Sequence, residues 1–161
     1  MRRLLAVAST VAMLAIFAVP ASAASPCGSS GQGAQTCTMN LHDQSMTFPS
    51  VGMPCLPDGT VSITNENGVI HFTVNRAGDF WATGTFEGNF TAVPFNPLAP
   101  TFTGHFAMWF GDEQNNKNFV SNSTFNIQGK GSDGSTIDLH ASVGFGVSAS
   151  GNPIMHMNLT C

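Results

Sequence analysis

Residues 79–111, DFWATGTFEGNFTAVPFNPLAPTFTGHFAMWFG, decide the fold of this 161-residue chain. Side chains of a β-strand alternate between the two faces of its sheet. In both halves of the stretch every second residue is Phe, Ala, Met or Gly, and most residues between them are polar. The alternation predicts two long strands joined by a proline-rich connection at residues 92–100, with one face in the core. The expected core face carries Phe80, Ala82, Gly84, Phe86, Gly88, Phe90, Phe102, Gly104, Phe106, Met108 and Phe110.

Three glycines on this face, Gly84, Gly88 and Gly104, indicate bends or close packing against large neighbours. If Phe90 lies opposite Phe102, large residues pair on the core face and Glu87 falls opposite a histidine on the polar face. The same register brings the two tryptophans of the chain close together. We therefore predict a polar-face patch formed by Trp81, Glu87, His105 and Trp109.

The rest of the chain continues the β pattern and shows no helical period from residue 60 onward. The dipeptide Asn67-Gly68 predicts a tight turn between two strands. Seven strands are expected at residues 60–64, 69–75, 79–91, 101–111, 119–128, 136–147 and 154–160, with one or two short, weakly patterned strands at 36–48. Short connections favour an antiparallel up-and-down meander. We expect an all-β fold of seven to nine strands closed into a small barrel, with a β-sandwich as the alternative.

The N-terminal 23 residues have the pattern of a secretory signal peptide. A basic start at Arg2 and Arg3 precedes an apolar run, and Ala21-Ser22-Ala23 matches a cleavage site. A retained membrane anchor would need about 20 apolar residues, more than this run supplies. We expect a secreted protein without a membrane span after cleavage near Ala23. The expected organisation is a signal peptide at 1–23, an extension with weak strands and a local disulfide at 24–53, and a barrel domain at 54–161.

The charge of the chain after the leader argues against two classes of partner. After the leader only Arg76, Lys117 and Lys130 remain against nine acids, a net charge of about −6. Three scattered cations form no basic patch, which argues against nucleic acid or anionic lipid as a partner. All four cysteines lie beyond the leader, and an even count in an oxidising compartment predicts two disulfides with three possible connectivities.

Residues with catalytic or metal-binding chemistry are sparse. Glu87 with His105 is the one acid–base pair that the expected register brings together, and an exposed cross-strand pair explains it equally well. Asp138 and His140 point the same way from one strand, but zinc would need a third ligand. No nucleophile elbow or nucleotide-binding glycine motif occurs. We therefore assign no catalytic residue, metal or cofactor, and keep His140 with the four patch residues as ligand or interaction candidates, because outward tryptophans can mark a carbohydrate or protein contact.

Several motifs resemble a group of small, uncharacterised secreted proteins of actinobacteria. They are Asn67-Gly68-Val69 leading into HFTVN, then GTFEGNF, TGHFAMWFG, GSDGS with Ile137 and His140, and the closing Cys161, and they span residues 54–161. The resemblance implies a Cys55–Cys161 disulfide, leaving Cys27 with Cys37. The first bond would also tie the start of the strand expected at residues 60–64 to the end of the last strand, as barrel closure requires. The group lends no catalytic residues.

Three functions are therefore considered. The first is a non-enzymatic secreted barrel that binds a small apolar ligand or a surface component. The second is a structural or protein-interaction domain with a packed core, and the third is an enzyme that uses the Glu87–His105 pair. A hollow interior would favour the apolar ligand, and a filled interior the structural role.

Overall fold

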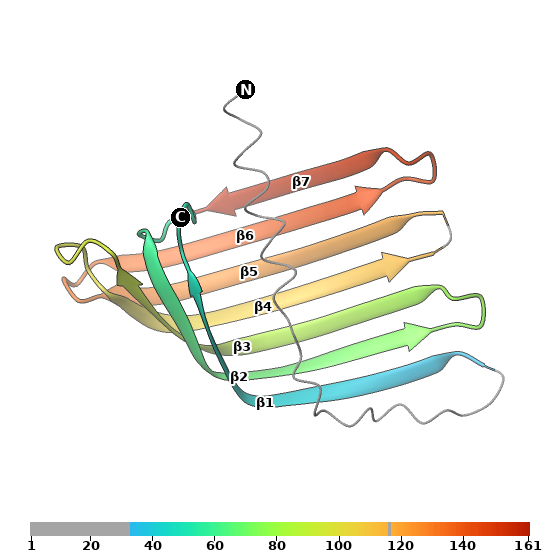
Figure 1. Cartoon of the computed structure of the whole chain (residues 1–161), viewed down its shortest axis with the longest axis horizontal. Helices are drawn as coiled ribbons and strands as arrows, with labels where there is room; N and C mark the ends of the chain where they lie inside the picture. The colour runs from blue at the N-terminus through green and yellow to red at the C-terminus, as the bar shows by residue number, and fades with distance from the viewer. Residues whose placement is uncertain (1–32, 116) are drawn as a thin grey trace.

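Seven β-strands form one antiparallel sheet in chain order in the computed structural model, which describes residues 33–115 and 117–161 (Figure 1). The prediction of an all-β antiparallel meander is confirmed. The expected signal peptide, residues 1–23, lies outside the described residues. The strands are β1 (Gln35–Pro49), β2 (Gly59–Val74), β3 (Phe80–Pro94), β4 (Phe102–Gln114), β5 (Phe119–Gly131), β6 (Thr136–Val147) and β7 (Pro153–Thr160).

Two of the expected strand assignments differ from the structure. β2 continues through Asn67 and Gly68, so the predicted tight turn there is wrong. Gly68 does not have the positive φ that such a turn requires. The absence of a side chain at Gly68 instead leaves room for an aromatic ring, because the ring of Phe86 on β3 occupies the place where a Cβ at residue 68 would stand. The weakly patterned residues 36–48 belong to one long strand, β1, which pairs with β2.

β-bulges explain both the weak pattern of β1 and the bend of the sheet. The β1–β2 register shifts on either side of Gln44, and the β2–β3 register shifts between Thr64 and Asn67. Asp43 and Asn65 have positive φ values of 51° and 52° at these points. A bulge inserts an extra residue, bends its strand and interrupts the alternation of faces. The C-terminal end of β1 and the N-terminal end of β2 consequently fold across the inner face of the sheet, which is the face that carries the core (Figure 1).

The sheet does not close, and the predicted barrel is therefore wrong. β1 and β7 are its two edges, and no backbone pairing joins them. Barrel closure needs tilt and stagger throughout the sheet, whereas here the sharp bend is confined to one end of the sheet (Figure 1). At that end the β1–β2 loop reaches β7, and Cys55 is bonded to Cys161 with Cα atoms 5.6 Å apart. The result is an open, curled sheet with one tied end, related to the sandwich alternative.

The disulfide expected between Cys55 and Cys161 is present. Cys37 is buried and disulfide-bonded on β1. Its expected partner, Cys27, lies outside the described residues. Across the described ranges, 33–115 and 117–161, no helix is long and apolar enough to cross a membrane.

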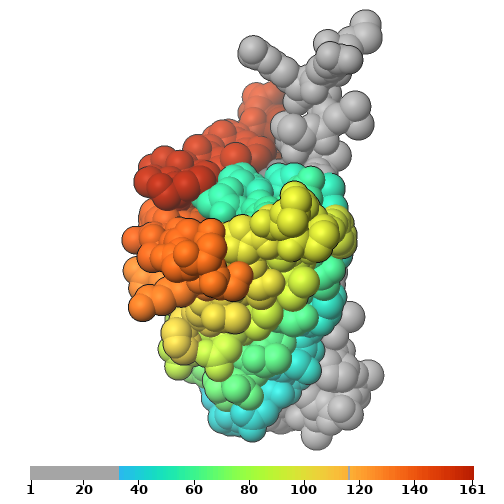
Figure 2. Space-filling view, turned by 90° about the vertical axis from the view of Figure 1, so that its left-hand side faces the viewer, coloured from blue at the N-terminus to red at the C-terminus, as the bar shows by residue number. Residues whose placement is uncertain are grey.

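At the tied end the β1–β2, β3–β4 and β5–β6 loops pack side by side, as the teal, yellow and orange segments of Figure 2 show. The backbone N–H of Phe95 in the β3–β4 loop donates to the Asp58 carbonyl in the β1–β2 loop, at 2.9 Å. The N–H of Ser132 in the β5–β6 loop donates to the Thr101 carbonyl, also at 2.9 Å. These bonds and the disulfide fix the end at which the sheet curls over its own inner face.

The core lies on the inner face, and the predicted inward side of β3 and β4 is confirmed. Phenylalanines pack into spaces left by glycines on neighbouring strands, as predicted for the core-face glycines. The ring of Phe110 lies where a Cβ on Gly84 would stand, and the ring of Phe106 comes within 2.8 Å of the equivalent point on Gly88. The buried cluster contains Leu56, Val61, Ile63, Phe86, Phe90, Ala92, Phe106, Ile127, Ile137 and Leu139.

Candidate functional site

The register of β3 and β4 places the predicted patch residues two positions from where they were expected. Glu87 lies opposite Ala107, and His105 lies opposite Asn89. Phe90 pairs with Gly104 rather than with Phe102. Pairing a large with a small residue fills the core more evenly than pairing two phenylalanines, which explains the shift. The expected Glu87–His105 opposition is therefore wrong, although both side chains remain on the outer face.

The same shift separates the two tryptophans. Trp81 lies opposite Glu113, whereas Trp109 lies opposite Thr85. Residues 81 and 85 of β3 are four positions apart, or about 13 Å along an extended strand. Trp81 and Trp109 therefore share the outer face without forming the predicted diagonal pair.

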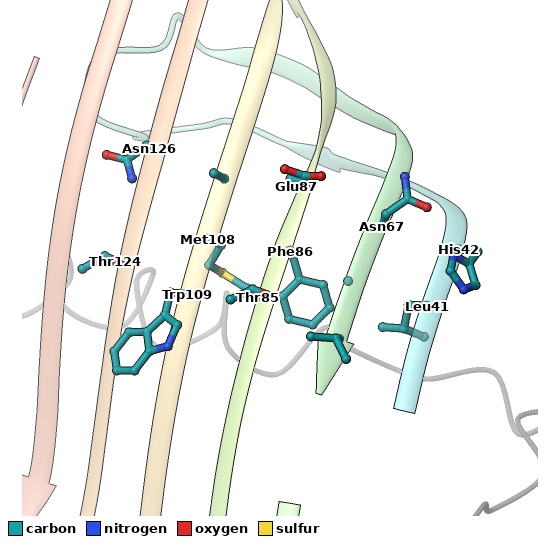
Figure 3. A pocket seen from close by; sticks show the side chains of 13 residues that line it. Leu41, His42, Asn67, Thr85, Phe86, Glu87, Met108, Trp109, Thr124 and Asn126 are labelled. Atoms are coloured by element: carbon teal, nitrogen blue, oxygen red, sulfur yellow. The ribbon is translucent and has the colours of Figure 1, made fainter. Parts of the chain in front are cut away.

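A groove of about 490 Å³ runs across β1 to β5 on this outer face (Figure 3). Six of its thirteen lining residues have polar side chains, and apolar atoms make up the larger part of its surface. Ala107 forms its centre, with the taller Glu87 and Asn126 opposite it on the two neighbouring strands. The lining residues are Leu41, His42, Asn67, Gly68, Val69, Thr85, Phe86, Glu87, Ala107, Met108, Trp109, Thr124 and Asn126.

Trp109 forms an aromatic wall of the groove. The six-membered ring of its indole lies over Gly111, with Cη2 and Cζ2 at 3.0 and 3.1 Å from the point where a Cβ on that glycine would stand. A side chain at residue 111 would displace the ring. The side chain of Trp109 is nevertheless 42% exposed. The indole is therefore supported by the sheet while part of its surface remains accessible to a ligand.

Asn126 is held in position by the neighbouring strand. Its Oδ1 lies 2.5 Å from Nδ1 of His140, which stands opposite on β6. This contact engages the amide oxygen of Asn126 and leaves its Nδ2 hydrogens available as donors. His140, one of the predicted candidates, thus contacts a lining residue and does not itself line the groove.

Asn67 is fixed at the other side of the groove. Its Oδ1 accepts from the N–H of Asp43 at 3.3 Å, and its Nδ2 donates to the Asn65 carbonyl at 3.0 Å. Within the described part of the chain, no hydrogen bond or ion pair engages the side chains of Glu87, Thr85 or Thr124. The groove therefore presents a carboxylate acceptor, two hydroxyls and an amide donor beside an aromatic surface.

The electrostatics of the groove are simple. Glu87 is the one carboxylate among the lining residues, and neither Lys nor Arg lines it. Among residues 33–115 and 117–161 there is no cluster of three His, Cys, Asp or Glu side chains that could hold a metal ion. The arrangement suits a neutral, hydroxyl-rich ligand better than an anion.

Glu66 is a buried acid that the sequence does not single out. It is 4% exposed and lies at the β2 bulge, opposite Gln44 of β1. Burial raises the pKa of its carboxyl above the ordinary value. In the sequence the flanking asparagines give residues 65–67 the composition of a turn, and only the bulge explains why the carboxyl is directed inward.

No family model, curated protein or solved structure matches this chain. The candidate site therefore rests on the geometry of the described residues.

Several groove residues were missed by reasoning from the sequence. Thr85, Ala107, Thr124 and Asn126 were visible as outward positions of their strands, but only the true register brings them together. Gly111 is the signal that could have identified the role of Trp109, because a glycine two residues along the same face leaves room for an indole. His105 was predicted for the patch and does not line the groove.

Proposed function

We propose that the protein is a secreted, non-enzymatic binding module whose outer-face groove binds a neutral carbohydrate of a surface component. The supporting observation is the Trp109 indole, which is held over Gly111 beside unengaged hydroxyl and carboxylate groups and the free amide donor of Asn126. The face of an aromatic ring carries negative charge density and attracts the C–H groups on one side of a sugar ring. The hydroxyls of the sugar can then hydrogen-bond to Glu87 and Asn126.

The size of the groove is compatible with this ligand class. Ligand sites usually measure about 300–1,000 Å³, and the groove measures about 490 Å³. Glu87 and Asn126 stand on strands two apart, which separates them by roughly 10 Å. A sugar placed over Ala107 would therefore lie between an acceptor and a donor, with the indole along one side.

Of the two ligand types expected from the sequence, the groove chemistry favours a surface component over a small apolar molecule. Although most of the groove surface is apolar, six of its thirteen lining residues have polar side chains. A wholly apolar ligand would leave the unengaged polar groups without partners, at a cost of about 1–3 kcal/mol for each buried one. The separation of Glu87 from its expected partner His105 favours binding over acid–base catalysis. The disulfide is compatible with an oxidising compartment, in keeping with export.

The test uses the two tryptophans of the chain. The Trp81→Phe variant keeps Trp109 as the sole tryptophan, and the matched Trp109→Phe variant keeps Trp81. Both are titrated with a panel of neutral cello-, chito- and malto-oligosaccharides while tryptophan fluorescence is recorded. Saturable change in Trp81→Phe, without change in Trp109→Phe, supports the proposal. Absence of saturable binding across the panel and across a polysaccharide array would favour the structural role.

A further inference from the structure

β7 is an edge strand that is open to pairing along most of its length. Every residue of β7 except Leu159 is exposed, and its outer edge has no partner among the described strands. Its large apolar side chains are exposed on both faces: Ile154 by 59%, Met155 by 43% and Met157 by 51%. An exposed apolar edge is a template for another strand, because its backbone N–H and C=O groups lack partners.

The usual protection of an edge is missing from this strand. β7 contains no Asp, Glu, Lys or Arg, and its one proline, Pro153, is its first residue. Its register with β6 is continuous, without a bulge. The ring of His156 lies over Gly144 of β6, in the place of a Cβ, and is therefore directed away from the open edge. No charged or bulky side chain of β7 therefore blocks the pairing of another strand with its open edge.

The opposite edge is protected. β1 carries register shifts at Gln44 and a positive φ at the charged residue Asp43. Bulges twist an edge away from a flat partner and charges oppose pairing. Head-to-tail pairing of β7 with β1 of another molecule would therefore be poor. β7 is the better partner for a second β7.

We propose that β7 pairs antiparallel with β7 of a second copy, giving a two-fold symmetric dimer with one continuous sheet. An isologous interface closes after two copies, and the neutrality of β7 removes like-charge repulsion. The registers are restricted because a one-residue slip would turn the methionines to the polar face. Every register that places a residue opposite its own copy keeps the faces matched, for example those with His156 or with Met157 opposite its own copy. In these two examples Met155 and Met157 face apolar residues of the partner copy.

The dimer would also have a consequence for binding. A two-fold axis perpendicular to the sheet leaves both outer faces on the same side. Two grooves on one surface would bind a repetitive ligand with avidity. Dimerisation itself does not depend on the proposed carbohydrate site, and its test uses no ligand.

The experiment measures molecular mass by sedimentation equilibrium over protein concentrations up to roughly 1 mM, a range that reports interactions as weak as about −4 kcal/mol. The wild type is compared with the double variant Met155→Lys/Met157→Lys, which places like charges on facing strands. Val93→Lys/Val120→Lys is the matched control, since both valines are exposed on β3 and β5, away from the β7 edge. We expect a wild-type dimer, at least a tenfold weaker dimer in the β7 variant, and a control equal to wild type.

Amide hydrogen exchange of the wild type keeps the proposal testable if the lysine variant fails to fold. Protection of β7 amides that rises with protein concentration, without a matching rise in β1, supports the dimer. A wild-type monomer at all concentrations would overturn the proposal. So would a dimer unaffected by the β7 lysines, an open-ended series of larger species, or β7 exchange that is independent of concentration.

Discussion

The indole of Trp109 lies directly over Gly111, two residues further along β4, so that the absence of a side chain at one residue determines the position of the other. Thr83 stands opposite Gly111 on β3, with its Cγ2 at 3.9 Å from the same point. The ring thus rests on the sheet rather than projecting from it. A supported ring loses less conformational freedom when a ligand binds, which favours affinity.

Replacing Gly111 with valine should weaken carbohydrate binding while both tryptophans remain. Valine suits a strand, but its Cβ would stand about 3 Å from the indole and force the ring away. Affinity, measured by titration calorimetry, should fall by tenfold or more, or about 1.4 kcal/mol. The matched control is Thr83→Val, which changes the opposite residue with nearly the same volume. Full affinity in Gly111→Val would contradict the role given to the supported ring.

Removing the contact between His140 and Asn126 should weaken binding without abolishing it. His140→Leu leaves the Asn126 amide free to rotate, because its Oδ1 loses the partner at 2.5 Å. A lost positioning hydrogen bond of this kind is worth about 0.5–1.5 kcal/mol, so the Kd should rise roughly two- to tenfold. His156→Leu is the comparison, because that histidine packs over Gly144, away from the groove. If the two variants lose affinity equally, the effect is not specific to Asn126.

Opening the Cys55–Cys161 disulfide should destabilise the whole domain. The bond spans 106 residues, and a loop of that size is worth up to about 4–5 kcal/mol in the chain-entropy model. The double variant Cys55→Ser/Cys161→Ser should therefore show a much lower midpoint of urea unfolding. Hydrogen exchange should increase first in the β1–β2 loop, which the bond ties to β7. A loss below about 1 kcal/mol would show that the loops packed side by side hold this end without the bond.

The stability of the protein should fall as pH rises through the pKa of Glu66. Burial raises that pKa above 4.5, so the folded state holds the proton more tightly than the unfolded state. The neutral carboxyl contributes stability that is fully present below pH 4.5 and is lost as pH rises through the folded pKa. The Glu66→Gln variant removes this ionisation. Its free energy of unfolding, measured between pH 4 and pH 8, should lack this loss, and the same pH dependence in both proteins would contradict the assignment.

The sequence predicted the strands of the sheet's centre well, because every second residue from 80 to 92 and from 102 to 110 is Phe, Gly, Ala or Met. It failed where bulges interrupt the alternation. Asn65 and Asp43 shift the inward positions of β2 and β1, and no local pattern distinguishes such a bulge from a turn. The prediction of a closed barrel was wrong for the same reason, because the bend that the bulges create is local.

The candidate site could be predicted only in part. The outward direction of Trp109 and Glu87 follows from the period of two, and both do line the groove. Their neighbours depend on the cross-strand register, which pairs phenylalanine with glycine rather than with phenylalanine. A shift of two residues preserves each face but replaces His105 with Ala107 opposite Glu87. The residues that form the site therefore differ from those predicted, but they lie on the predicted face of the sheet.

The most direct measurement is the fluorescence titration of the Trp81→Phe variant, in which Trp109 is the only tryptophan, with the panel of neutral oligosaccharides. A saturable change for at least one oligosaccharide, at least tenfold weaker in affinity when Gly111→Val is added to the same variant, is the predicted result. An unchanged Trp109 signal during binding that calorimetry detects would place the carbohydrate elsewhere and contradict the account.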